Sequence, residues 1–280
     1  MALISSARWT LLFWGVISVS RISGQGRNYA ASSVLVTGNW YRIGVTAPGI
    51  YSIDQAFLAK LGVSASGLSS SSLQLFGNGG GMLPEAPATP VPDDLKELAV
   101  WVDDGGDGSF DGKDRLLFFA EGPDHWVNDS LRRSFRHVKN LYSDTAYYYL
   151  TIGANGKRIS TGTPTAGNAV PVKNFDYRYF HELDTFNFLS SGKQWYGEEF
   201  SNLPGRSPSR VFPVSFPSVP AAPVQIKVEV VGRSIGAASG FSATSGSQLL
   251  FETSLPPVAS GPFDLFAQTK QQEALVDAPG

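Results

Sequence analysis

The most informative absence in this chain of 280 residues is cysteine, which does not occur at all. Without a thiol there is no disulfide, no thiolate zinc site and no cysteine nucleophile within these residues, whatever the compartment. The length and the apolar fraction of 42% nevertheless allow one large or two ordinary domains with a sizeable core.

Charge of either sign is also sparse. The chain has 22 Lys and Arg residues against 24 Asp and Glu residues, and no basic cluster alternates with aromatic residues along one stretch. Proteins that bind nucleic acid or anionic membrane surfaces usually present such clusters. We therefore do not expect nucleic acid or a membrane surface as a partner.

Catalytic motifs are equally scarce. The three histidines, His125, His137 and His181, are isolated and show neither H-x-H nor H-E-x-x-H spacing. No G-x-S-x-G elbow, phosphate-binding loop or dinucleotide fingerprint occurs. We expect structural histidines, and the sequence identifies no catalytic or cofactor-binding residue.

Glycine, proline and aromatic residues are plentiful, whereas helical periodicity is rare. This composition predicts short strands joined by turns, and thus a mainly β fold. Residues 40–45 and 50–53 are predicted to form a hairpin around a turn at 47–49. Asp54 is predicted to cap one short helix that Gly62 ends.

A second hairpin is predicted where two apolar segments, 98–102 and 115–120, flank an acidic glycine loop. A turn at 153–156 is predicted to start a further hairpin. A polar passage at 160–168 suggests a boundary between a β-rich module, residues 30–165, and a β-sandwich-like module, residues 170–280. Other predicted strands include residues 73–75, 145–152, 175–180, 224–231, 247–252 and 263–267.

The first 24 residues are typical of a secretory signal peptide. Arg8 precedes an apolar run from Trp9 to Val19, and small and polar residues follow through Gly24. The run is shorter than the roughly 20 residues needed to span a bilayer, so cleavage near Gly24 is favoured over a permanent anchor. We expect an exported protein.

The acidic loop of the second hairpin also suggests a calcium site. Its oxygen-bearing side chains fall at offsets resembling a calcium loop, although Gly105 stands where a ligand is wanted. A solvated turn, in which aspartates bond to nearby backbone groups, is the alternative. No cofactor is required, but calcium is a candidate ion with the ligands Asp103, Asp107, Ser109, Asp111 and Asp114.

An adjacent acidic pair, Glu198 and Glu199, lies beside Trp195 and Tyr196. Aromatic rings next to carboxylates are found in sugar-binding sites. Neighbouring side chains on a strand point to opposite faces, however, so the two carboxylates would not flank one glycosidic bond. This disfavours a glycosidase, while a glycan-binding surface and a core role for the aromatic residues stay open.

Several stretches in order resemble one known family. They are GIYSID, LFGNGG, LPE, DDLKELAVWVDDGGDGSFDGKDRLLFFAEGPDHW, NLYSDTAYYYLTIG and HELDTFNFLSSGKQWYGEEF, which together span residues 40–200. This order resembles the N-terminal part of the PorU-type sortases of the bacterial type IX secretion system, which belong with the gingipain-type cysteine peptidases. AEGPDHW followed by SGKQWYGEEF is the most specific combination.

The resemblance implies a cell-surface, outer-membrane enzyme that removes C-terminal secretion signals from cargo and links the cargo to lipopolysaccharide. It also implies that residues 30–165 are like a gingipain pro-domain. Its implied partners are a peptidase domain, type IX cargo and outer-membrane components of the secretion system.

The chain departs from that family in one decisive respect. The family's catalytic His and Cys lie in a later α/β domain, and these 280 residues contain no such domain and no Cys. We therefore expect a fragment that supplies the non-catalytic modules, so enzymatic activity of the chain itself stays undecided. The alternative is a non-enzymatic secreted β-sandwich protein that binds a surface or a glycan and is stabilised by calcium.

Overall fold

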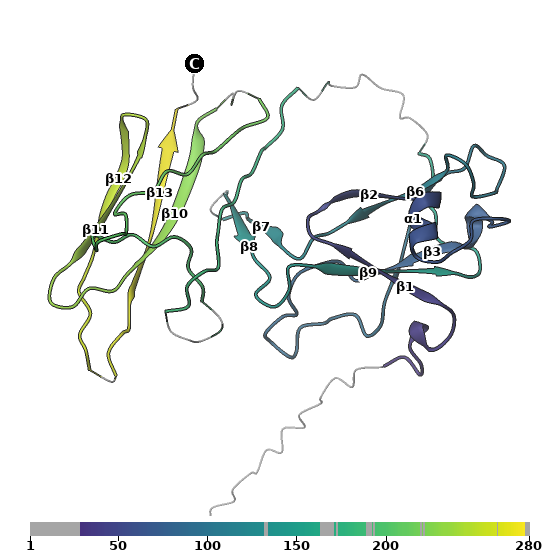
Figure 1. Ribbon diagram of the computed structural model, residues 1–280, viewed down its shortest axis with the longest axis horizontal. Helices are drawn as coiled ribbons and strands as arrows, with labels where there is room; N and C mark the ends of the chain where they lie inside the picture. Colours follow the sequence, from purple (N-terminus) through teal and green to yellow (C-terminus); the bar gives the residue numbers. More distant parts are fainter. Residues whose placement is uncertain are drawn as a thin grey trace, which may run out of the picture. The chain divides into compact units, whose positions relative to one another are not determined.

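The computed structural model describes residues 29–131, 134–162, 171, 173–188, 192, 194–218, 220, 222–261 and 263–277 (Figure 1). The chain divides into two units. The first comprises residues up to Asp124 and from Asp144 to Ser160, and the second comprises His125–Ser143 and the residues from Thr161 onward. The predicted signal peptide, residues 1–24, lies outside the described residues. No helix within the described residues has the length and apolar character to cross a membrane.

The predicted mainly β fold is confirmed, because most regular elements are strands in antiparallel sheets. The first unit holds one four-stranded sheet in the order β1-β9-β3-β4. Its strands are β1 (Trp40–Val45), β9 (Ala146–Ile152), β3 (Leu73–Phe76) and β4 (Glu97–Leu98). A three-stranded sheet in the order β2-β6-β5 is built from β2 (Gly49–Asp54), β6 (Arg115–Ala120) and β5 (Trp101–Asp103).

The predicted pairing of the first two strands is wrong, although their positions are right. β1 pairs with β9, and β2 pairs with β6, so the turn at 47–49 connects two different sheets. Each strand alternates buried and exposed residues, and the buried face of its partner, β9 or β6, is mostly apolar. Long-range packing of apolar faces therefore overrides the local hairpin signal.

The predicted strand at 98–102 is likewise divided. Glu97 and Leu98 pair with β3, whereas Trp101–Asp103 pair with β6, so the chain changes sheets at Val100. Val100 is fully buried, and its N–H and C=O groups bond to Lys157 and Ile159. The turn at 153–156 consequently starts no hairpin, and Arg158 forms an isolated parallel bridge with Val100 instead.

The predicted helix is confirmed as α1 (Gln55–Lys60). The Asp54 carboxylate caps it by accepting a hydrogen bond from the N–H of Phe57 at 2.8 Å. Gly62 adopts a φ of 78°, and the N–H of Val63 bonds to the carbonyl of Leu58 at 2.9 Å, which is a Schellman ending. Two single 3-10 turns, Val34–Val36 and Ser70–Ser72, complete the helical elements of the described residues.

Both sheets and α1 of the first unit share one core. Tyr148 lies near its centre, with 1% of its surface exposed, and its ring packs against Phe118. The Tyr148 hydroxyl accepts a hydrogen bond from the N–H of Glu121 at 2.7 Å and donates one to the Glu121 carbonyl at 3.0 Å. Burial raises the pKa of Tyr148. The other buried members of the core are Ile43, Val45, Ile53, Leu58, Val63, Leu73, Leu75, Val100, Phe110, Leu116, Phe118, Ala120, Ala146 and Leu150.

Within the described residues, the second unit contains three strand pairs. They are β7 (His125–Asp129) with β8 (Ser134–Val138), β10 (Val224–Gly232) with β13 (Gln268–Val276), and β11 (Ser239–Ser245) with β12 (Gln248–Leu255). β12 lies beside β13 (Figure 1). The sequence placed its module boundary at 160–168, whereas the structure ends the first unit at Ser160 and groups residues 125–143 with the second unit.

Two predicted strands of the second unit are wrong. Residues 175–180 and the described residues of 263–267 form no strand, whereas residues 224–231 lie in β10 as predicted. In the first segment, side chains and not backbone groups make the contacts: the Tyr177 ring lies 6.0 Å from the Phe216 ring, and Phe180 stacks on His137 at 3.8 Å. An alternating pattern alone does not supply a partner strand.

We expect Tyr148→Phe to lower the free energy of unfolding by about 1–2 kcal/mol, because the substitution leaves a half-buried N–H and C=O of Glu121 without their partner. Denaturant unfolding measures the change. Tyr149→Phe is the matched control, since Tyr149 points to the other side of β9 and its hydroxyl makes no hydrogen bond within the described residues. Equal losses in the two variants would contradict this role of the Tyr148 hydroxyl.

Candidate functional site

The candidate site is the acidic loop, residues 104–114, which joins β5 to β6. The pair Asp103 and Arg115 closes the loop, with 3.4 Å between the Asp103 carboxylate and the Arg115 guanidinium. Both side chains are more than half exposed, so this ion pair contributes little to stability. Gly105, Gly106 and Gly108 all have positive φ, which permits the tight bends between the aspartates.

Phe110 anchors the middle of the loop. Its side chain is fully buried in the core of the first unit, and its N–H donates to the carbonyl of Leu68 at 2.8 Å. The N–H of Ser70 donates to the carbonyl of Gly108 at 3.0 Å. The anchoring role of Phe110 was not predicted, although its single apolar ring among acidic and glycine residues is a visible signal in the sequence.

Both carboxylate oxygens of Asp104 accept hydrogen bonds. One oxygen accepts a hydrogen bond from the Ser70 hydroxyl, and the other accepts one from the N–H of Gly106 at 3.0 Å. These bonds, that of Ser70 first, lower the pKa of Asp104. The Arg158 guanidinium holds the same segment, since it donates to the Ser70 carbonyl at 2.7 Å.

The structure does not gather the five predicted calcium ligands into one site. Asp103 faces Arg115, the Asp107 carboxylate accepts from the N–H of Ser109 at 2.8 Å, and the Asp114 carboxylate accepts from the N–H of Asp111 at 2.7 Å. Within the described residues, no three acidic or histidine side chains are placed to hold a metal ion. An ion at this loop would have to replace these side-chain-to-backbone bonds.

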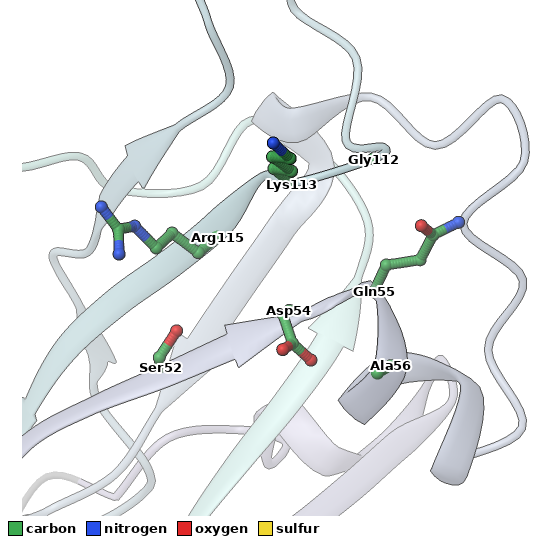
Figure 2. Close-up of a pocket in the computed structure, with 7 residues that line it drawn as sticks. All are labelled: Ser52, Asp54, Gln55, Ala56, Gly112, Lys113 and Arg115. Atoms are coloured by element: carbon green, nitrogen blue, oxygen red, sulfur yellow. The ribbon is translucent and has the colours of Figure 1, made fainter.

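An open hollow of about 430 Å³ lies beside the loop (Figure 2). Its walls come from the end of β2, the start of α1 and the segment that leads into β6. Asp54 is already engaged as the cap of α1, and Lys113 and Arg115 supply positive charge. The hollow therefore offers polar contacts and positive charge, while its one lining carboxylate is already engaged. The lining residues are Ser52, Asp54, Gln55, Ala56, Gly112, Lys113 and Arg115.

The acidic pair of the second unit is divided between two partners. Glu198 lies 2.6 Å from the His181 ring, and Glu199 pairs with Arg206. The two carboxylates therefore do not form a catalytic pair. Trp195 is 38% exposed, whereas Tyr196 is half-buried and bridges to Phe186.

A second polar cluster lies where β8 ends. Lys139 pairs with Asp184, and Glu182 bonds to the Asp184 side chain. Burial, followed by the hydrogen bond to Asp184, raises the pKa of Glu182. Next to this cluster His137 packs between Trp126 and Phe180, which is a structural environment for a histidine.

We expect Ser70→Ala to raise the pKa of Asp104, because the substitution removes the hydrogen bond that lowers this pKa most. Carboxyl chemical shifts followed against pH measure this pKa. Since the fold depresses it, Asp104 stabilises the folded state above its unfolded pKa and loses that effect as the pH falls through the folded value. Ser72→Ala is the control, because the Ser72 hydroxyl bonds to the Ser69 carbonyl. An unchanged pKa of Asp104 in Ser70→Ala would refute this explanation.

Calcium binding at the acidic loop stays a prediction from the sequence. We expect calorimetric titration of residues 25–280 with calcium to give a heat of binding, and Asp107→Ala to abolish it. Asp176→Ala, which changes an exposed aspartate outside the loop, is the control and should keep the heat of binding. Calcium should also raise the melting temperature of the unmodified chain. Equal heats and equal melting temperatures for the chain and Asp107→Ala would eliminate the site.

Comparison with known proteins identifies no matching family model and no matching curated protein. Among solved structures, the chain is similar to the crystal structure of PorU from Porphyromonas gingivalis in its dimeric latent form. The TM-score is 0.54 at 21% sequence identity, and the match covers 88% of this chain but 22% of the PorU chain. The chain thus spans less than a quarter of the length of PorU, and its fold is like that of one part of PorU.

Proposed function

We propose that this chain is the non-catalytic N-terminal region of a PorU-type sortase, a gingipain-type cysteine peptidase of the type IX secretion system. The complete enzyme would remove C-terminal signals from secreted cargo and attach the cargo to lipopolysaccharide at the cell surface. The observation that carries the proposal is the similarity of fold to PorU over 88% of the chain.

The sequence supports the same proposal independently of the fold. The stretches that resemble the family occur in the family's order from residue 40 to residue 200, and they include the specific pair AEGPDHW and SGKQWYGEEF. AEGPDHW has a structural role in part, because the buried Tyr148 hydroxyl forms hydrogen bonds with the backbone of Glu121. SGKQWYGEEF contains the aromatic pair Trp195 and Tyr196.

In this proposal the chain packages, positions or restrains a peptidase domain that belongs to another part of the same polypeptide. It contributes no cysteine nucleophile, because these 280 residues include no cysteine. The predicted signal peptide would direct export, and the outer-membrane components of the secretion system would be its neighbours at the cell surface.

Removal of the coding region for residues 29–277 from the source organism, with the reading frame kept, tests the proposal. We expect secreted cargo to keep its C-terminal signal and to lose its attachment to lipopolysaccharide, as mass spectrometry and immunoblotting of surface fractions would measure. Trp195→Ala at the native locus is the matched control, since it alters an exposed side chain and should leave processing intact. Normal processing of cargo in the deletion strain would refute the proposal.

One observation favours a second candidate, a surface protein that binds glycans without enzymatic activity. Trp195 is exposed in the second unit, as are Tyr177 and Tyr179, and exposed aromatic rings stack on sugars. The same deletion experiment separates the two, because a glycan-binding protein would be dispensable for cargo processing and its Trp195→Ala variant would lose surface attachment.

A further inference from the structure

Within the described residues, the two sheets of the first unit have four edge strands, and three of them carry the protection that edge strands usually have. β1 has a basic residue, Arg42, in its middle. β4 and β5 are two and three residues long, and each includes one acid, Glu97 or Asp103. Such mid-strand charges and short strands prevent an edge from pairing with another chain.

The fourth edge strand, β2, lacks these devices. Its sequence, GIYSID, contains no proline, and its one charge, Asp54, is the last residue of the strand and caps α1. Its six residues are a usual length for a strand inside a sheet. Within the described residues, β2 pairs with β6 alone, and no hydrogen bond joins its other edge to a neighbouring segment. β2 is therefore an edge that can accept a further strand.

The exposed face of the β2-β6-β5 sheet consists of rows of directly opposite residues that run across the strands. In the first row Ile50 lies opposite Phe119, and the two side chains are 76% and 61% exposed. In the second row Ser52 lies opposite Leu117, which lies opposite the exposed Trp101. An apolar residue of an added strand opposite Ile50 would extend the first row and cover its side chain.

The third row alternates in charge. It runs from Asp103 of β5 through Arg115 of β6 to Asp54 of β2. At the open end of the row, Oδ1 of Asp54 accepts the hydrogen bond from the N–H of Phe57, whereas its Oδ2 accepts none within the described residues. A basic residue of an added strand opposite Asp54 would continue the alternation, because opposite charges directly across two strands attract.

The surroundings of this row also favour a basic partner. The acidic loop starts and ends at the same end of the sheet, and it has four carboxylates against the one ammonium group of Lys113. Figure 2 shows Ser52 and Asp54 on β2, with Arg115 on the neighbouring strand and Lys113 on the segment that leads into it. Both cations thus lie on the β6 side of Asp54, whereas an added strand would lie on the opposite side. Complementary charge of this kind selects a partner and fixes its register.

We propose that β2 binds an extended segment of another polypeptide, which adds as an antiparallel strand with a basic residue opposite Asp54 and an apolar residue opposite Ile50. The residue between these two on the same face lies opposite Ser52 and is small and polar. The remaining two residues lie beside Tyr51 and Ile53 on the inner face, where β-branched residues fit. The proposal concerns binding by the first unit and is independent of the proposed sortase function.

NMR titration of isotope-labelled residues 25–280 with the peptide Lys-Val-Thr-Val-Ile, blocked at both ends, tests the proposal. We expect saturable changes in chemical shift that are confined to β2 and to the residues of β6 that lie beside it. The reversed peptide Ile-Val-Thr-Val-Lys has the same composition but exchanges the basic and apolar ends. It should bind about fivefold more weakly, because it places Lys opposite Ile50.

Two variants locate the contact. Asp54→Asn keeps the cap of α1 but removes the charge, and it should weaken binding of the first peptide by about two- to fivefold. It should leave unchanged the binding of the same peptide with Gln in place of Lys. Ile50→Lys puts a charge inside the edge strand and should weaken binding by about tenfold. Leu131→Lys is the matched control, since Leu131 is 95% exposed and lies in the second unit, and it should bind normally.

Circular dichroism and the melting temperature verify that each variant is folded. Unchanged chemical shifts at β2, equal binding of the forward and reversed peptides, or equal losses in Ile50→Lys and Leu131→Lys would overturn the proposal. Amide hydrogen exchange of the chain without peptide provides a second test. Protection of the amide groups on the open side of β2 would show that another segment or a second copy already covers this edge, which would also overturn the proposal.

Discussion

The first unit depends on the burial of Tyr148 between two sheets. β9 brings this side chain into the core, where its ring packs on Phe118 of the other sheet and its hydroxyl satisfies both backbone groups of Glu121. A buried polar group is tolerated only when it is hydrogen-bonded, so this contact fixes the end of β6 relative to β9. The same arrangement positions the acidic loop, because the loop connects β5 to β6 and its Phe110 side chain is buried in the same core.

Local sequence signals predicted the positions of strands and of the helix better than they predicted which strands pair. The positions of β1, β2 and α1 followed from alternation, from the Asp54 cap and from Gly62, all of which act over a few residues. The pairing of β1 with β9 joins residues more than a hundred positions apart, and no turn signal encodes it. The strand expected at residues 175–180 failed for a related reason, since its alternating aromatic residues found ring contacts and no partner strand.

The candidate site shows the same limit. That Asp107 and Asp114 bond to nearby backbone groups could be expected from aspartates next to glycines in a turn. The hydrogen bond between Ser70 and Asp104 could not be expected in this way, because the two residues are 34 positions apart and come together only when Phe110 is buried. The loop thus behaves as part of the folded core of the first unit, and its carboxylates are engaged in ordering it.

The two units differ in how completely they bury their apolar residues, and this difference bears on function. The first unit has a filled core, whereas the second exposes many aromatic side chains and leaves the apolar strand β10 at an edge. Maintaining an apolar edge without a partner carries a risk of aggregation, which evolution usually removes with a charge, a proline or a bulge. β10 carries two such charges, Lys227 and Glu229, on one face, while Ile226, Val228 and Val230 lie on the other face. The charges protect the edge, and the half-buried side chains of the opposite face contribute to the packing of the second unit.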